Sequence, residues 1–117
     1  MARHNAQGSA AEERAMRHLQ AQGLRLLERN LRNHGGEIDL IMRQADTLVF
    51  VEVRFRQSRR FGSAAETVTP AKQRRLIAAA ALYLQKNRLD LPCRFDVVAI
   101  TGPQEEIEWI RDAFQLH

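Results

Sequence analysis

The sequence predicts one α/β domain, spanning 1–117, in which a mixed β-sheet is flanked by helices. Two segments with helical spacing of apolar residues stand on either side of three strand-like segments, and two more strand-like segments follow the second helix. Because a helix between two strands is the usual crossover of a parallel pair, the strands before and after the second helix are expected to run parallel. The length of 117 residues and the 44% of hydrophobic residues suit one modest core.

The first part of the chain predicts a helix, a strand and a glycine turn. The first seven residues are expected to be mobile, and "SAAE" at 9–12 has the form of a capping box. An apolar stripe then predicts a helix over about 10–22, ended by Gly23. "LRLLERNLRN" predicts a strand over about 24–32, and Gly35-Gly36 predicts the turn that follows it.

The second part predicts another helix and two strands after a polar, arginine-rich loop at 57–68. Thr69-Pro70 is a strong helix start, with threonine as the N-cap and proline at the first helical position, and the helix should end near Asn87. "CRFDVVAI" is mostly apolar and therefore predicts an interior strand. "EIEWIRD" alternates over a short length, which is typical of an edge strand.

Composition restricts the class of protein. No apolar run approaches the roughly 20 residues that span a bilayer, and the N-terminal segment lacks the apolar centre of a secretory signal. The single cysteine, Cys93, cannot form an internal disulfide, so a cytoplasmic location is expected. Lys plus Arg number 18 against 14 Asp plus Glu, with a pI of about 10.2, which permits a nucleic-acid partner.

The segment "GGEIDLIMRQADTLVFVEVRFR" carries acidic residues inside two predicted strands. Side chains alternate between the faces of a strand, so the first strand should place Glu37, Asp39 and Ile41 on one face and Ile38, Leu40 and Met42 on the other. The second strand should place Glu52 and Arg54 on the face of Phe50, opposite to the valines.

A hairpin closed by Arg43 and Leu48, with a four-residue loop over 44–47, gives a register in which opposed residue numbers sum to 91. Ile41 then meets Phe50, Asp39 meets Glu52, and Glu37 meets Arg54. A slip by one residue would mix charged and apolar faces, which makes the register specific. The pattern therefore brings Asp39 and Glu52 to within roughly 5 Å at their Cβ atoms.

Two opposed carboxylates repel each other unless a cation lies between them. Mg²⁺ and Mn²⁺ prefer such oxygen ligands, and an adjacent Arg54 would stabilise the negative charge that develops in phosphoryl transfer. The other interpretation is a solvated sheet face with cross-strand ion pairs, Glu37 to Arg54 being the obvious one. For the whole set, the segment favours a metal site.

Five segments together resemble a known family: "GSAAEERA", "ERNLRNHGGEIDLI", "LVFVEVRFR", "FGSAAETVTPAKQRRL" and "FDVVAI". They are similar to the YraN family (UPF0102-type) of small bacterial proteins, which resembles archaeal Holliday junction resolvases of the PD-(D/E)xK nuclease superfamily. The resemblance runs from about Gly8 to Ile100. It implies a restriction-endonuclease-like αβββαβ core, a metal-dependent endonuclease activity on branched DNA, and a homodimer, because a two-fold junction suits a two-fold enzyme.

The resemblance also assigns roles to residues of this sequence. Asp39 and Glu52 become the metal-binding acids, with the backbone carbonyl of Val53 as a further ligand. The acid of the first helix corresponds to Glu12, and the glutamine early in the second helix corresponds to Gln73.

Several of these residues have a second interpretation. Glu12 is also the third residue after Ser9 in the capping box, and could serve the helix alone. Gln73 could hydrogen-bond the sheet edge, Asp96 could pair with an arginine, and Glu37 could be an ion-pair partner instead of a ligand.

Arg54 departs from the family pattern, because it stands where the motif has lysine. Arginine keeps the positive charge but cannot act as a base, since its pKa exceeds about 12. The departure leaves metal binding and charge stabilisation in place and raises a second hypothesis, a non-catalytic nucleic-acid-binding module that keeps the nuclease fold. A third hypothesis is a structural or protein-interaction domain.

Basic residues follow the second acidic strand and begin the second helix. Their phosphate contacts would give salt-sensitive binding of DNA without sequence preference, although a solvated loop is the plain alternative. The chain shows no spacing typical of zinc sites and no nucleophile elbow, so serine or cysteine hydrolysis is unsupported. The residues expected to contact nucleic acid are Arg56, Arg59, Arg60, Lys72, Arg74 and Arg75.

Overall fold

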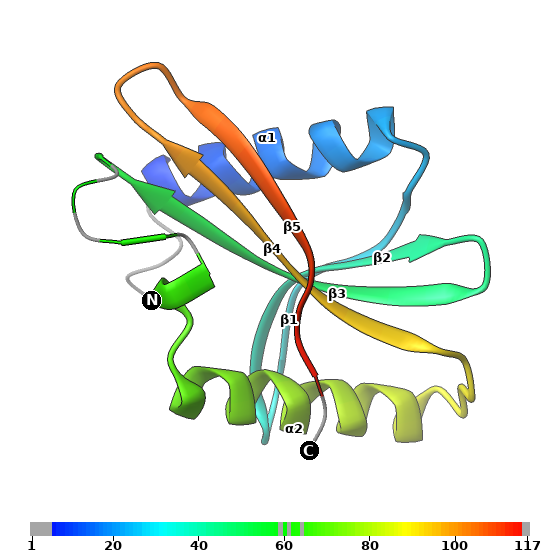
Figure 1. Ribbon diagram of the computed structural model, residues 1–117. Coiled ribbons are helices and arrows are strands. Elements are labelled where there is room, and N and C mark those ends of the chain that lie inside the picture. The colour runs from blue at the N-terminus through cyan, green and yellow to red at the C-terminus, as the bar shows by residue number, and fades with distance from the viewer. Residues whose placement is uncertain (1–5, 59, 61, 64, 116–117) are drawn as a thin grey trace.

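The computed structural model describes residues 6–58, 60, 62–63 and 65–115. A twisted five-stranded sheet runs through the molecule, with one helix on each of its faces (Figure 1). The elements are α1 (Ala6–Ala21), β1 (Arg25–Asn33), β2 (Gly36–Gln44), β3 (Thr47–Arg56), the short 3₁₀ helix η2 (Ala65–Thr67), α2 (Pro70–Lys86), β4 (Cys93–Thr101) and β5 (Glu106–Phe114).

The sheet confirms the predicted fold class. Its strand order is β1-β2-β3-β4-β5, so β4 is interior and β5 is an edge strand, as the apolar and alternating patterns predict. β3 and β4 run parallel and are joined through α2, whereas the other three neighbouring pairs are antiparallel. The result is the expected mixed sheet flanked by helices, with the element order of an αβββαβ core followed by a last strand.

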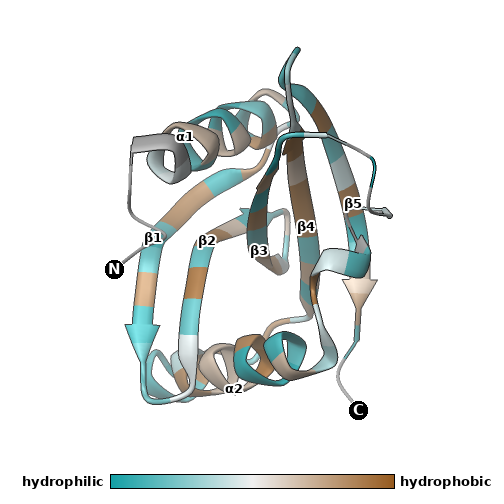
Figure 2. Ribbon diagram, turned by 90° about the vertical axis from the view of Figure 1, so that its left-hand side faces the viewer, coloured by the Kyte–Doolittle hydropathy of each residue, from teal (hydrophilic) through white to brown (hydrophobic). Residues whose placement is uncertain are grey.

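Each helix covers its own apolar cluster. Beneath α2, Leu76 and Ala80 pack against Phe50 of β3 and Phe95 of β4. Another cluster lies beneath α1, where Ala15 and Leu19 meet Leu40, Val51 and Val98. The central strands β3 and β4 carry long hydrophobic stretches between the two helices (Figure 2), because both of their faces are covered.

Helix α1 begins earlier than predicted, and the capping-box interpretation is wrong. The helix starts at Ala6, so Ser9 and Glu12 lie inside it and not at its cap. Serine and glutamate cost only a few tenths of a kcal/mol in a helix interior, and a four-residue pattern does not locate a helix start to within a turn. Glu12 therefore does not cap α1. Gly23 ends the helix as predicted, with φ of 96°.

The β2–β3 hairpin has the predicted register and a shorter loop. Opposed residues sum to 91 from Leu40–Val51 to Gln44–Thr47. Pairing continues to Gln44 and Thr47, so the loop has two residues instead of four. Ala45 takes a positive φ of 52° in this loop, the backbone conformation that short hairpin loops require.

The turn between β1 and β2 is held against α2 by a hydrogen bond and a close backbone contact. The Asn33 side chain donates to the Ala79 carbonyl at 3.0 Å and accepts from the Gly35 N–H at 2.9 Å. A Cβ added at Gly35 would lie 2.6 Å from the backbone carbon of Ala78 and from the backbone nitrogen of Ala79. Only glycine permits this approach of two backbones, so the turn fixes where α2 lies along the sheet.

Cys93, at the start of β4, is expected to react slowly with thiol reagents. Burial raises the pKa of its thiol, and its Sγ lies 3.2 Å from the Leu91 carbonyl. Because the thiolate is the reactive form, a raised pKa leaves less of it at pH 8. We expect labelling by a disulfide reagent in the folded protein to be at least about tenfold slower than in urea. Equal rates in the two states would contradict this.

Among the described residues, no helix is long and apolar enough to cross a membrane.

Candidate functional site

Three acidic side chains lie almost completely buried in the sheet and helix α1. Glu12 is 3% exposed, Asp39 is 2% exposed and Glu52 is 1% exposed. Carboxylates are rarely buried to this extent unless hydrogen bonds, cations or metals compensate for the lost hydration. They are three of the residues that the sequence selects as candidate ligands.

Asp39 lies where strands β2 and β3 stop pairing. The ladder ends at Leu40–Val51, one residue before the expected Asp39–Glu52 pair. Beyond this point the Asp39 side chain takes the place of a backbone acceptor, because its Oδ2 accepts from the Val53 N–H at 2.8 Å. The Asp39 carboxylate is thereby fixed beside the backbone of the residue that follows Glu52.

The two-residue alternation of β2 breaks at the same place, which corrects one prediction. Ile38 packs with Ile41 in the cluster beneath α2, whereas Leu40 and Met42 share one face, as expected, and lie beneath α1. The break coincides with the end of the β2–β3 ladder and with a positive φ of 52° at Asn30 on the neighbouring strand β1. On β3 the alternation holds, because Phe50 faces α2 and the valines face α1.

Two cations from different elements lie beside Glu52. Arg54 Nε is 3.2 Å from Glu52 Oε2, and Lys72 Nζ is 3.8 Å from the same oxygen. Arg54 is two residues along the same strand, whereas Lys72 reaches across from the first turn of α2. The sequence places Lys72 among the phosphate contacts, and the structure places its ammonium at the buried carboxylate.

The start of α2 positions Lys72. Thr69 caps the helix as predicted, and its Oγ1 accepts from the Lys72 N–H at 3.2 Å. Gln73, the other candidate here, donates its side-chain amide to the Val68 carbonyl at 3.0 Å. This bond ties the helix to the preceding loop and points the Gln73 amide at the backbone, so its catalytic role stays a prediction.

Glu12 contacts a residue that sequence reasoning missed. Asn30 lies in β1 across from Asp39, between the Arg29–Leu40 and Leu31–Ile38 pairs. With its amide oriented as the neighbouring acceptors require, its nitrogen donates to Glu12 Oε1 at 2.9 Å and to Oε2 at 3.3 Å. Asn30 thus connects Glu12 of α1 to the part of the sheet where Asp39 lies.

The predicted pairing of Glu37 with Arg54 is wrong. Glu37 Oε1 lies 2.8 Å from Arg32 Nε on the neighbouring strand β1. Because β2 and β3 no longer pair at this level, Glu37 is drawn to β1, with which pairing continues through Arg32–Glu37. Arg54 instead forms an ion pair with Glu52.

Apart from Lys72, the predicted phosphate contacts divide into three groups. Arg56 is half-buried and donates to the Gly62 carbonyl at 2.7 Å, so it holds the following loop. Arg60, Arg74 and Arg75 are exposed and accessible to a polyanion. Arg59 lies outside the described residues.

Asp96 is a structural carboxylate, which agrees with its interpretation as an arginine partner. It is fully buried and accepts two bonds from Arg94, at 2.9 and 3.1 Å. The Trp109 indole and the Asp112 backbone N–H each donate to it at 2.9 Å. Arg94 belongs to β4 itself, whereas the Trp109 and Asp112 donors tie the interior strand β4 to the edge strand β5.

The carboxylate oxygens of the site are the kind of ligand that hard divalent cations prefer. No three His, Cys, Asp or Glu residues in the described ranges form a ready metal cluster. Mg²⁺ nevertheless commonly takes only one or two carboxylates and keeps several waters, and Asp39 and Glu52 are two carboxylates on adjacent strands. The two cations beside Glu52 show that this position stabilises positive charge.

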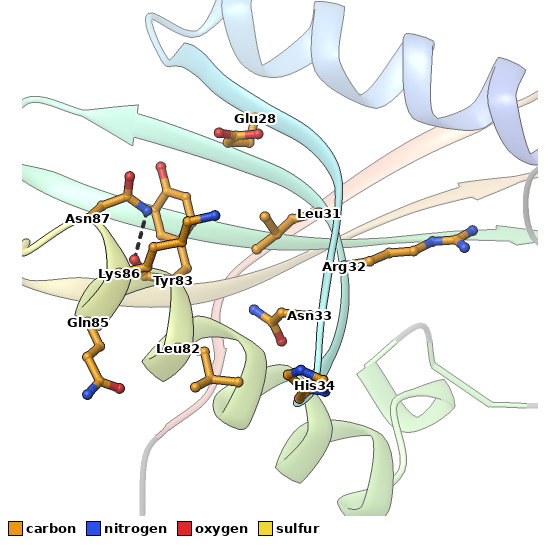
Figure 3. A pocket seen from close by; sticks show the side chains of 10 residues that line it. All are labelled: Glu28, Leu31, Arg32, Asn33, His34, Leu82, Tyr83, Gln85, Lys86 and Asn87. Carbon is orange, nitrogen blue, oxygen red and sulfur yellow. Dashed lines mark hydrogen bonds between the residues drawn. The ribbon is translucent and has the colours of Figure 1, made fainter.

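A cavity of about 350 Å³ lies elsewhere, between β1 and the C-terminal half of α2 (Figure 3). Tyr83 and Leu31 form part of its wall, and Glu28 lies above the tyrosine ring. Burial, and to a smaller extent the negative charge of Glu28, raise the pKa of Tyr83. None of the three buried acids lines this cavity, so it is separate from the candidate site.

Comparison with known proteins agrees with the resemblance of the sequence segments. Residues 11–100 match the model of the Uncharacterised protein family UPF0102. The chain belongs to the UPF0102 family. A UPF0102 protein of Ralstonia pickettii is 60% identical over 114 residues, covering 93% of this chain and 90% of the relative. One of Saccharophagus degradans is 56% identical over 119 residues, covering 100% and 99%.

This UPF0102 protein thus holds its candidate acids in three different elements, α1, β2 and β3. Two contributors escaped sequence reasoning in whole or in part. Asn30 could have been noticed as a poor strand former in the middle of "LRLLERNLRN". The position of Lys72 beside Glu52 depends on how α2 crosses the sheet, for which the sequence carries no local signal.

Proposed function

We propose that this UPF0102 protein is a metal-dependent endonuclease that hydrolyses phosphodiester bonds in branched or structured DNA. The observation that carries the proposal is the junction of β2 and β3. There the carboxylates of Asp39 and Glu52 are almost completely buried where the ladder ends, and two cations lie beside Glu52. Such a group of fixed charges in a poorly hydrated position is typical of sites that stabilise developing charge.

Mg²⁺ or Mn²⁺ is the proposed cofactor. Asp39 and Glu52 would hold it, with the Val53 carbonyl and Glu12 as further ligands. The bound ion would supply Lewis-acid polarisation of the phosphate and a lowered pKa of bound water.

The protein's own side chains have separate roles. Arg54 provides a permanent positive charge near Glu52, suited to the negative charge that builds on the phosphorus oxygens. Arg60, Arg74 and Arg75 are exposed, and we assign them to the DNA backbone. A homodimer would give two such sites related by a two-fold axis, which matches a two-fold branched substrate.

One observation favours a second function, a nucleic-acid-binding module without catalysis. Glu52 already has two protein cations within 4 Å, so its charge is compensated without a metal ion. A protein of this kind would bind branched DNA equally with and without Mg²⁺, and the Asp39→Asn variant would bind as well as the wild type.

Asp39→Asn is expected to reduce cleavage at least about 100-fold, since a metal-bound transition state loses several kcal/mol with one ligand. The asparagine oxygen can still accept from the Val53 N–H, which keeps the local fold. Cleavage of labelled four-way, flapped and linear DNA is measured with Mg²⁺ and with Mn²⁺. Asp46→Asn is the matched control, because Asp46 is 90% exposed. Folded wild type that cuts none of these substrates would refute the proposal.

A further inference from the structure

We propose that Lys72 is a tethered counter-ion of Glu52 that competes with a divalent cation for the same carboxylate and so sets the metal affinity of the site. This inference rests on the proposed metal site and adds its regulation. It begins from one contact, the Lys72 ammonium 3.8 Å from Glu52 Oε2. Glu52 is 1% exposed and the Lys72 side chain is 18% exposed, so water screens their attraction only weakly.

Lys72 lies in the first turn of α2, which is an unusual position for a cation. The first turn of α2 contains Lys72 and no acidic residue, although the positive end of the helix dipole favours acids there. A lysine in that turn is unfavourable unless a negative partner compensates for it. Glu52 is the partner, and the Thr69 cap fixes the backbone from which the lysine reaches it.

Among the described residues, two cations lie beside Glu52, and they differ in how easily they can leave. Arg54 Nε is 3.2 Å away and belongs to the same strand, so its position is tied to that of the carboxylate. The Lys72 contact is longer than the 2.7–3.2 Å typical of a hydrogen bond and is therefore electrostatic. Its ammonium sits on a flexible four-carbon stem and can turn away without moving the backbone. Lys72 is thus the cation that a metal ion displaces.

The chain offers a clean test because its only lysines are Lys72 and Lys86. Mn²⁺ binding is measured by calorimetry for the wild type, Lys72→Met and Lys86→Met. Lys72→Met is expected to bind Mn²⁺ at least about tenfold more tightly, since the competing charge near 4 Å is gone. Lys86→Met removes an equal charge from the exposed last turn of the same helix and should match the wild type. Lys72→Arg keeps the charge and should bind about as the wild type does.

A second measurement needs no substitution at Lys72. Protein labelled with ¹⁵N at the lysine Nζ gives one ammonium signal for each of its two lysines, and Lys86→Met assigns them. Titration with Mg²⁺ is expected to shift the Lys72 signal and leave the Lys86 signal in place. Two unshifted signals would overturn the inference even if Lys72→Met does not fold.

The outcomes separate this inference from the proposed function. Equal Mn²⁺ affinity in the wild type and Lys72→Met, or binding by neither, would overturn the competition. Tighter binding by Lys72→Met together with no DNA cleavage by the wild type would support the competition and refute the nuclease. DNA cleavage by the wild type, together with equal Mn²⁺ affinity in the wild type and Lys72→Met, would support the nuclease and refute the competition.

Discussion

Replacing Asp96 by asparagine is expected to lower the free energy of unfolding by about 3–5 kcal/mol, the usual cost of removing one partner of a buried ion pair. The wild-type carboxylate accepts four bonds from Arg94, Trp109 and Asp112. In the variant, an amide NH₂ would face donors that need an acceptor, and the partly buried Arg94 would lose its counter-ion.

Urea unfolding followed by tryptophan fluorescence measures this effect directly, because Trp109 is the only tryptophan and donates to Asp96. Asp46→Asn makes the same chemical change at a highly exposed site and should alter stability by less than about 0.5 kcal/mol. A loss below about 1 kcal/mol in Asp96→Asn would show that the network does not hold β5 to the sheet.

Replacing Gly35 by alanine is expected to cost about 2–3 kcal/mol or more, through overpacking of one backbone against another. The new methyl group would lie 2.6 Å from backbone atoms of Ala78 and Ala79, and no flexible side chain there can move aside. Either the β1–β2 turn or helix α2 must shift. Because α2 carries Lys72, Mn²⁺ affinity should change as well as stability.

Gly23→Ala is the control that separates packing from backbone strain. Gly23 has φ of 96°, and a Cβ there would meet nothing within 4 Å. Its expected cost is therefore the left-handed backbone alone, about 1 kcal/mol. Thermal unfolding of both variants decides the matter: a Gly35→Ala protein as stable as Gly23→Ala would mean that the turn does not press against α2.

The sequence was a good guide to the fold wherever a local pattern was reinforced by burial. Thr69-Pro70 located the start of α2, and the unbroken apolar run of "CRFDVVAI" placed β4 in the interior. The pattern failed for Ser9, where a capping motif was continued as ordinary helix. A cap is a local signal of about 1 kcal/mol, and the surrounding chain can override it.

The candidate site was less accessible to sequence reasoning. Hairpin pairing predicted the register that leads Asp39 toward Glu52, and this register holds from Leu40 onward. It could not predict that pairing stops there, that Glu37 turns to Arg32, or that Lys72 arrives from another element. Each of these depends on sheet twist or on helix docking, which are properties of the assembled molecule and not of a short segment.

The bond between Asp39 and Val53 makes one backbone proton sensitive to events at the site. Most amide hydrogens of a central strand are protected by neighbouring strands, but that of Val53 is held by a side-chain carboxylate. Its rate of exchange with deuterated solvent therefore depends on whether Asp39 keeps this hydrogen bond. The rate can be measured in the absence of any substrate. The amide signal of Val53 in β3 thus reports whether the Asp39 carboxylate binds this N–H or another partner.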